Sequence, residues 1–196
     1  MNFAGITIGF ALSASHCTFS EVVPQIDRLV AAGANLVPLA SPSLLSTDTR
    51  FGTSDFWQKE LKERTGNDII STIVEAEPLG PSKRFDVLVI APCTGNTTSK
   101  LANALTDNAV LMAAKAQMRN QRPLVIAVST NDGLGLNAAN IAKLLSAKSL
   151  YFVPFGQDAP FAKPNSLVAK MELIPETCEA ALAGKQLQPL IIERFH

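Results

Sequence analysis

Two short, almost wholly apolar runs constrain the fold of this chain most strongly: FDVLVI at residues 85–90 and LVIAV at residues 124–128. Both have the length of a strand, and neither alternates apolar with polar residues, as a strand with one face in water would. A strand that is apolar on both sides must be covered on both faces. The runs therefore predict central strands of a parallel sheet that lies between two layers of helices.

Helical patterns alternate with strand-length runs along the chain. We expect further strands at residues 3–9, 36–40, 68–74 and 150–153. We expect helices from a Thr18–Glu21 capping box to Gly33, and at residues 56–64, 97–120 (one helix or two), 138–147 and 175–183, with a loop at 75–84. The alternation predicts an α/β, three-layer, Rossmann-like fold with a mostly parallel sheet. Because no linker, repeat or low-complexity block interrupts the pattern, residues 1–196 are expected to form a single domain.

Composition and charge narrow the possible partners. The 17 Lys and Arg residues balance the 17 Asp and Glu residues, and this neutrality argues against nucleic acid or an anionic membrane as a partner. Hydrophobic residues make up 47% of the chain, so a homo-oligomer is expected. Three widely spaced cysteines favour a reduced protein without a metal site, and no run reaches the roughly 18 apolar residues of a spanning helix. We expect a cytoplasmic protein without a signal peptide.

Small, uncharged side chains follow four of the expected strands. They occur in GFALSASH (9–16), SPS (41–43), APCTGNTT (91–98) and STNDGLGLN (129–137). Taken singly, each could be a capped turn or a solvated loop. Because ligands of open parallel sheets bind outside the carboxyl ends of the strands, four such ends favour a ligand crevice. Hydroxyls, amides and small residues suit a flat heteroaromatic ring with a phosphate, as in a flavin mononucleotide (FMN) or another nucleotide.

One segment resembles a known family. The run APCTGNTTSKLANALTDN is similar to the APASANTIAKIANGIADN segment of the flavin-containing cysteine decarboxylase superfamily, which also holds the flavin prenyltransferases. Within it, the runs GFALSASHCTF, RPLVIAVSTNDGLGLNAANI and YFVPFGQDAPFAKPNS most resemble the dipicolinate synthase B subunits. The resemblance covers nearly the full chain.

The resemblance implies an FMN-type pocket. The residues implied to bind the cofactor are Gly9, Phe10, Ala11, Leu12, Ser13, Ser41, Pro92, Thr94, Gly95, Asn96, Thr97 and Asn131. The loop from Gly9 to Ser13 would hold the phosphate with Ser41, and the residues from Pro92 to Thr97 would lie along the flavin and the substrate. Asn131 stands where the decarboxylases have the Asn of a PAMNxxMW motif.

The sequence also departs from the decarboxylases. Residues 75–84 contain no histidine, the PAMNxxMW motif is replaced by VSTNDGLG, and Cys93 and Gly95 stand where alanine is usual. Decarboxylation of a cysteine is therefore not expected. Candidate catalytic residues are His16 beside the implied phosphate, Cys93 with a thiol pKa lowered by a helix N-terminus, and Asp132 as a general base. A capping histidine, a pocket-lining cysteine and a structural aspartate are the alternatives, and the catalytic residue stays open.

The family resemblance implies a two-subunit oxidoreductase of sporulation. The B subunit would form pyridine-2,6-dicarboxylate from a dihydrodipicolinate-type precursor in the mother cell, together with an NAD(P)-dependent A subunit. A homo-oligomer of three subunits, or a multiple of three, is implied as well. Lys163, with Asn165 and Ser166, could meet the dicarboxylate, or could belong to a solvated loop. The alternatives are an independent FMN-dependent decarboxylase or flavin prenyltransferase, and a non-catalytic assembly subunit.

Overall fold

Strands β3 (Val87–Thr94) and β4 (Leu124–Thr130) pair in parallel at the centre of a seven-stranded sheet. The computed structural model describes residues 1–194. All but the last residue of each central strand is buried, as their apolar sequences predict. The remaining strands are β1 (Thr7–Leu12), β2 (Asn35–Ala40), β5 (Leu150–Phe152), β6 (Phe155–Gly156) and β7 (Leu167–Ala169). Their order is β2-β1-β3-β4-β7-β6, and β5 pairs with the first half of β4.

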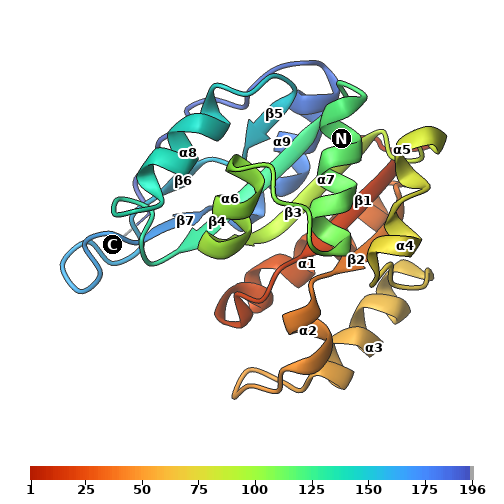
Figure 1. The fold of residues 1–196 in the computed structure, drawn as a ribbon, viewed down its shortest axis with the longest axis horizontal. Coiled ribbons are helices and arrows are strands. Elements are labelled where there is room, and N and C mark those ends of the chain that lie inside the picture. The colour runs from red at the N-terminus through yellow and green to blue at the C-terminus, as the bar shows by residue number, and fades with distance from the viewer. Residues whose placement is uncertain (195–196) are drawn as a thin grey trace.

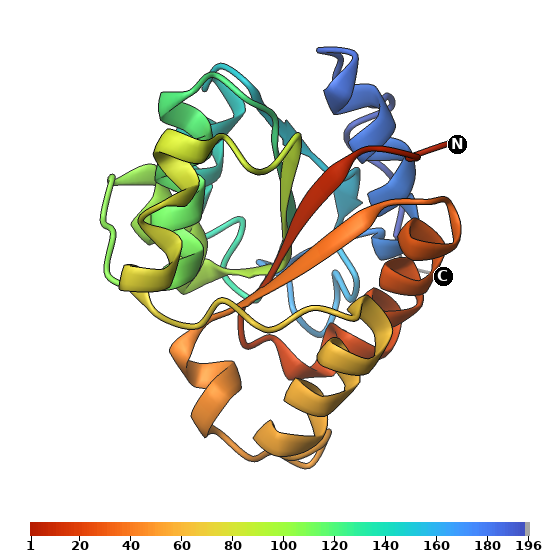
Figure 2. The ribbon, with the colours of Figure 1, turned by 90° about the vertical axis from the view of Figure 1, so that its right-hand side faces the viewer.

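Helices cover both faces of the sheet, as Figures 1 and 2 show. One layer holds η1 (His16–Thr18), α1 (Phe19–Ala31), η2 (Met171–Leu173) and α9 (Ile174–Leu182). The other holds α4 (Ile73–Ala76), α5 (Leu79–Ser82), α6 (Gly95–Ala102), α7 (Ala109–Arg119) and α8 (Ala138–Leu145). Beside β2 lie α2 (Pro42–Ser46) and α3 (Ser54–Thr65). The expected three-layer α/β fold with a mostly parallel sheet is confirmed.

Several expected elements need correction. The strand expected at residues 3–9 begins only at Thr7, because the chain turns at Gly5 with a φ of 79°. No strand forms at residues 68–74, where Ile70 makes a single bridge and Thr72 then caps α4. The expected loop at 75–84 contains the end of α4 and all of α5. For residues 97–120, where one helix or two were expected, the second alternative is confirmed, and Ala104 has a positive φ of 58° between the two helices.

The antiparallel edge was not predicted. β6 and β7 have two and three residues, too few for a periodic pattern. β7 pairs with the end of β4, at Ser129 and Thr130. A bridge between Phe155 and Ile191 then brings the carboxyl-terminal segment to the same edge. The edge therefore places sequence-distant residues beside the end of β4.

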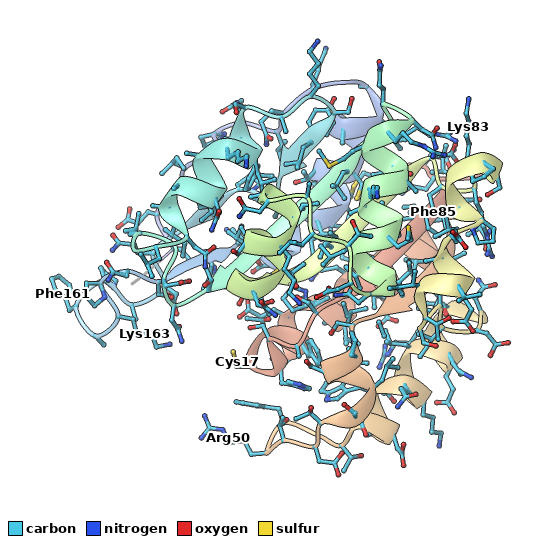
Figure 3. All side chains as sticks on the ribbon, in the orientation of Figure 1. Cys17, Arg50, Lys83, Phe85, Phe161 and Lys163 are labelled. Carbon is cyan, nitrogen blue, oxygen red and sulfur yellow. The ribbon has the colours of Figure 1, made fainter. Side chains whose placement is uncertain are left out.

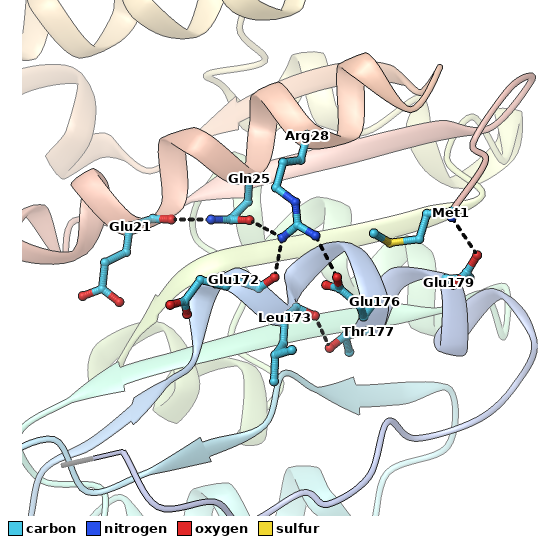
Figure 4. Close-up of polar contacts among 9 residues, drawn as sticks. All are labelled: Met1, Glu21, Gln25, Arg28, Glu172, Leu173, Glu176, Thr177 and Glu179. Atoms are coloured by element: carbon cyan, nitrogen blue, oxygen red, sulfur yellow. Dashed lines mark hydrogen bonds and ion pairs between the residues drawn. The ribbon is translucent and has the colours of Figure 1, made fainter. Parts of the chain in front are cut away.

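Helix α1 is fixed to the segment around α9 by one arginine (Figure 4). The guanidinium of Arg28 donates from Nη1 to the Glu172 carbonyl at 2.6 Å and from Nη2 to Glu176 Oε1 at 2.7 Å. Three residues before it, Gln25 Nε2 donates to the Glu21 carbonyl at 3.0 Å. These contacts set the position of Glu21 in the first turn of α1.

The capping box expected at the start of α1 is wrong. The hydroxyl of Thr18 donates to the Ser15 carbonyl at 2.9 Å and caps no amide of the helix. Glu21 is therefore not engaged in a capping box. Its carboxylate instead pairs with Arg194, 173 residues away along the chain. The expected stop at Gly33 is confirmed, with a φ of 94° directly after the C-cap.

Gly9 lies inside β1 and not in a loop. A Cβ added there would lie 2.6 Å from the ring of Phe85 and 2.8 Å from Leu88 Cδ1, so the strand requires glycine for packing. Phe10, Ala11 and Leu12 follow in the same strand with buried side chains. The loop expected from Gly9 to Ser13 is thus wrong for its first four residues, and only Ser13 stands beyond the strand.

Replacing Gly9 with alanine is expected to lower the free energy of unfolding by about 1–3 kcal/mol, since the Phe85 ring is buried and must shift. Urea unfolding checks this. Gly135→Ala is the matched control, because its Cβ would meet nothing closer than 3.4 Å. An unchanged stability of Gly9→Ala would contradict the packing role.

Candidate cofactor and substrate crevice

Two neighbouring cavities open at the carboxyl ends of β1 to β4, and Asn96 lines both. The smaller has a volume of about 400 Å³ and is lined by Ser13, Ala14, Ser41, Pro42, Ser43, Thr94, Asn96, Thr97, Lys100, Asp107 and Asn108. The larger has about 580 Å³ and is lined by Ser15, Cys17, Thr18, Glu21, Gly95, Asn96, Ser129, Thr130, Asn131, Asp132, Asn137, Asp158, Lys163, Val168 and Arg194. The four strand ends singled out in the sequence therefore meet in one crevice.

The smaller cavity is rich in hydroxyl groups. Ser13 Oγ donates to the Pro92 carbonyl at 2.7 Å and accepts from the Thr94 amide at 3.0 Å. Thr94 Oγ1 in turn accepts from the Thr97 amide at 3.3 Å, as the N-cap of α6. Ser41 Oγ is different, because it is buried and has no hydrogen-bond partner in the described chain. A buried polar atom without a partner is costly, so this hydroxyl is suited to a ligand.

The N-terminus of α6 lies at the boundary between the cavities. Gly95 and Asn96 from its first turn line the larger one, and Asn96 and Thr97 line the smaller one. The first amides of a helix have no intrahelical acceptor, and the helix dipole adds partial positive charge there. Lys100 lines the smaller cavity and forms an ion pair with Asp107. This cavity therefore fits an anionic group such as a phosphate.

A cluster from the loop after β4 packs against Gly95. Asp132 accepts two hydrogen bonds from Asn137 Nδ2, at 2.9 Å to Oδ1 and 2.8 Å to Oδ2, and a further one from the Thr130 hydroxyl. A Cβ on Gly95 would lie 2.8 Å from Asn137 Nδ2 and 2.9 Å from Asp132 Oδ1, and closer still to Thr130 Oγ1. The glycine that replaces the alanine usual in the decarboxylases thus makes room for this cluster.

The same cluster weakens Asp132 as a general base. The hydrogen bonds from Thr130 and Asn137 stabilise the charged carboxylate and lower its pKa. A carboxylate that is held on both oxygens and has a lowered pKa abstracts protons poorly. The geometry of Asp132 supports a structural role instead, in which the carboxylate positions the side chains of Thr130 and Asn137.

The other two catalytic candidates do not line the crevice. Both ring nitrogens of His16 are buried without a partner in the described chain, and its ring packs against Phe19 with a centroid distance of 4.9 Å. Burial lowers the pKa of His16. Cys93 is fully buried beside Thr98, and burial raises its thiol pKa to about 12. The expectation of a lowered thiol pKa is therefore wrong, because desolvation by burial raises it and the hydrogen bond with Thr98 offsets this only in part.

Of the predicted cofactor residues, seven reach the crevice. They are Ser13, Ser41, Thr94, Gly95, Asn96, Thr97 and Asn131. Pro92 contributes a carbonyl that accepts from Ser13, and Gly9 to Leu12 stay within β1. In the described chain, no group of three His, Cys, Asp or Glu side chains is placed to hold a metal ion. No helix of residues 1–194 is long and apolar enough to cross a membrane.

Charged residues of the larger cavity were missed from the sequence, apart from Asp132 and Lys163. Arg194 Nη2 donates to Glu21 Oε2 at 2.6 Å, and Arg194 Nε donates to the Ala169 carbonyl at 3.1 Å. On another wall, Lys163 Nζ lies 3.5 Å from Asp158 Oδ2. Arg194 follows no predicted parallel strand, so only the unpredicted antiparallel edge could have indicated it.

Comparisons with known proteins agree with the fold. Residues 4–185 match the family model described as Flavoprotein. The chain is 54% identical over 191 residues to the dipicolinate synthase B subunit of Bacillus subtilis (strain 168), covering 97% of this chain and 96% of that protein. The crystal structure of the dipicolinate synthase B subunit from Bacillus halodurans C is 55% identical, with a TM-score of 0.92 and full coverage of both chains. The FMN-dependent cysteine decarboxylase SpaF shares the fold at 15% identity, with a TM-score of 0.64 over 93% of this chain and 98% of that chain.

The sheet, its two helical layers and the crevice at the strand ends define a Rossmann-like α/β protein, and SpaF shares this fold. The chain belongs to the flavoprotein family and, within it, to the group of dipicolinate synthase B subunits. The recognition made from APCTGNTTSKLANALTDN and the other runs is therefore confirmed.

Substituting Gly95 with alanine is expected to lower the free energy of unfolding by about 1–3 kcal/mol, because the new methyl group would overlap the Thr130 hydroxyl and the Asp132 carboxylate. Combining it with Thr130→Ala removes the closest atom. The double variant should then lose less stability than the sum of the two single variants in urea unfolding. Additive losses would show that Gly95 and Thr130 do not interact.

Proposed function

We propose that this chain is the B subunit of a dipicolinate synthase, an oxidoreductase that forms pyridine-2,6-dicarboxylate from a dihydrodipicolinate-type precursor during sporulation. The observation that carries the proposal is the identity of 54% over 97% of the chain to a dipicolinate synthase B subunit. The enzyme acts with an A subunit that holds NAD(P). Residues 1–196 form one flavoprotein-like domain. The protein is located in the cytoplasm of the mother cell.

The smaller cavity is the proposed cofactor site, and its residues fit FMN. The unpartnered Ser41 hydroxyl, Ser13 and the N-terminus of α6 suit the phosphate. Asn96 and Thr97 would lie along the ring system, with Asn131 across the boundary in the larger cavity. FMN supplies hydride acceptance or donation when it is bound.

The residues of the chain then bind and orient the substrate, since every carboxylate that lines the two cavities is already hydrogen-bonded or ion-paired. Asp132 is held by hydrogen bonds, and Cys93 and His16 line neither cavity. Asn96 is the one residue common to both cavities, so it is the side chain placed to contact cofactor and substrate together. We also propose that three subunits, or a multiple of three, assemble around this site, as the superfamily resemblance implies.

FMN titration of the purified chain tests the cofactor site. Ser41→Ala should weaken FMN binding by about tenfold or more, because the hydroxyl would lose a hydrogen bond to a charged phosphate. Riboflavin, which lacks the phosphate, should bind the variant as it binds the parent chain. Stability should hardly change, since Ser41 Oγ bonds to nothing in the described chain.

Ser146→Ala is the control for this titration, because Ser146 lies on the surface at the C-cap of α8. Absence of FMN binding even at millimolar concentration would refute the flavin part of the proposal. The catalytic part of the proposal would then be judged by the reconstitution alone.

Reconstitution with a dipicolinate synthase A subunit tests the catalytic role. The mixture should form pyridine-2,6-dicarboxylate, while either subunit alone should form little. Asn96→Ala should lower the rate by about one to two orders of magnitude, because a contact that positions the substrate is lost. Asn2→Ala is the control, because Asn2 is exposed and precedes the amino end of β1, at the edge of the sheet opposite the crevice. Full activity of Asn96→Ala would place the active site elsewhere, and equal activity without this chain would make it a bystander.

A further inference from the structure

Two positively charged side chains line the larger cavity, and they come from different segments of the chain. Arg194 comes from the carboxyl-terminal segment beside α1, and Lys163 from the loop between β6 and β7. Figure 3 shows Lys163 on this loop, which projects from the body of the molecule, with Cys17 of the neighbouring wall labelled nearby. Ser129, Thr130 and Asn131 from the end of β4 also line the cavity, and they carry hydroxyl and amide groups but no charge. The cavity is therefore polar, with positive groups at separate positions on its walls.

Arg194 is fixed in place before any ligand binds. Its Nε donates to the Ala169 carbonyl and its Nη2 donates to Glu21, whose helix is itself fixed by Arg28. Gly156 lets the segment approach, since a Cβ there would overlap the carbonyl of Ile192, two residues before Arg194. An arginine held on two sides presents its remaining guanidinium edge with little loss of side-chain entropy.

The side chain of Arg194 is only 19% exposed, whereas that of its partner Glu21 is 41% exposed. The guanidinium is thus the more deeply placed member of the pair. The two described hydrogen bonds use Nε and Nη2, so Nη1 is not engaged by them, and Arg194 lines the cavity. A planar guanidinium edge in a partly desolvated wall is the geometry that recognises a carboxylate.

Lys163 differs from Arg194 in its freedom. Its side chain is 54% exposed and lies 3.5 Å from Asp158, a distance longer than a direct hydrogen bond between charged groups. Asp158 is already engaged by the Ser166 hydroxyl at 2.6 Å. The ammonium group on its flexible stem can therefore turn to a second anionic group of a bound ligand.

The charges that line the larger cavity do not favour the binding of anions in general. Glu21, Asp132 and Asp158 oppose Arg194 and Lys163, so no positive surplus draws anions of any shape. Recognition must then come from local pairing at two separate points. A small, flat molecule with two carboxylates satisfies both points, whereas a monocarboxylate satisfies one.

We infer that the larger cavity is a dicarboxylate subsite in which Arg194 anchors one carboxylate of the substrate and Lys163 pairs with the other. The inference deepens the proposed function and rests on it for the identity of the ligand. Arg194 acts here as a specificity-determining residue. The smaller cavity, which is the proposed cofactor site and shares Asn96 with the larger one, is not part of this subsite.

Calorimetric titration of the full chain with pyridine-2,6-dicarboxylate and with pyridine-2-carboxylate tests the inference. Arg194→Lys should weaken the dicarboxylate by about ten- to one-hundred-fold, the usual effect of losing hydrogen bonds to a charged group. Lys163→Ala should weaken it less and should reduce its advantage over the monocarboxylate. FMN affinity should stay unchanged in both variants, and Lys185→Ala, exposed beyond α9, should change neither ligand.

Glu21→Gln separates anchoring from a structural role. It removes the same ion pair but leaves the guanidinium, so an anchor predicts that it retains more dicarboxylate affinity than Arg194→Lys. Equal losses in the two variants, or unchanged binding in Arg194→Lys, would overturn the inference. Failure of the parent chain to bind the dicarboxylate would overturn it as well. The proposed function is judged separately, by dipicolinate formation in the presence of the A subunit.

Discussion

The parallel pairing of β3 with β4 is the constraint on which the site depends. Their register runs from Leu88 opposite Leu124 to Ile90 opposite Ile126, then shifts before Cys93 pairs with Val128. The irregularity lies where the Pro92 carbonyl accepts from Ser13 at the end of β1. Because β3 is buried on both faces, it cannot relax around this point. The fixed strand ends therefore bring the first loop, the N-terminus of α6 and the end of β4 together.

The strength of the local pattern decided which elements could be predicted from the sequence. The central strands are apolar throughout, and only a doubly covered sheet buries such runs, so β3 and β4 were identified. Residues 68–74 have strand-like composition, yet the Thr72–Glu75 capping box starts a helix there. At residues 3–6 the chain turns at Gly5, although Phe3 is buried in the core. Local backbone preference prevailed over apolar composition in both places.

The candidate site was predictable where it follows the strand ends and not elsewhere. Ser41, Thr94 and Asn96 come directly after predicted strands, so their meeting follows from the parallel topology. Arg194 and Glu21 are joined by the short antiparallel edge and the carboxyl-terminal segment, which no periodicity marks. The sequence therefore indicated the hydroxyl-rich half of the crevice far better than its charged half.

Two departures of this chain from the decarboxylases, Gly95 and the segment that replaces PAMNxxMW, form one physical unit. The segment that replaces PAMNxxMW supplies Thr130 and Asp132, and Asn137 follows two residues beyond it. This cluster fits only because position 95 carries no Cβ. Its carboxylate stands close to the N-terminus of α6, where it partly offsets the positive end of the helix dipole on the side of the larger cavity. The smaller cavity is lined by hydroxyl groups, and no carboxylate from the loop after β4 lines it. The same helix end thus favours a phosphate on one side and leaves the proposed carboxylate contacts of the other side to Arg194 and Lys163.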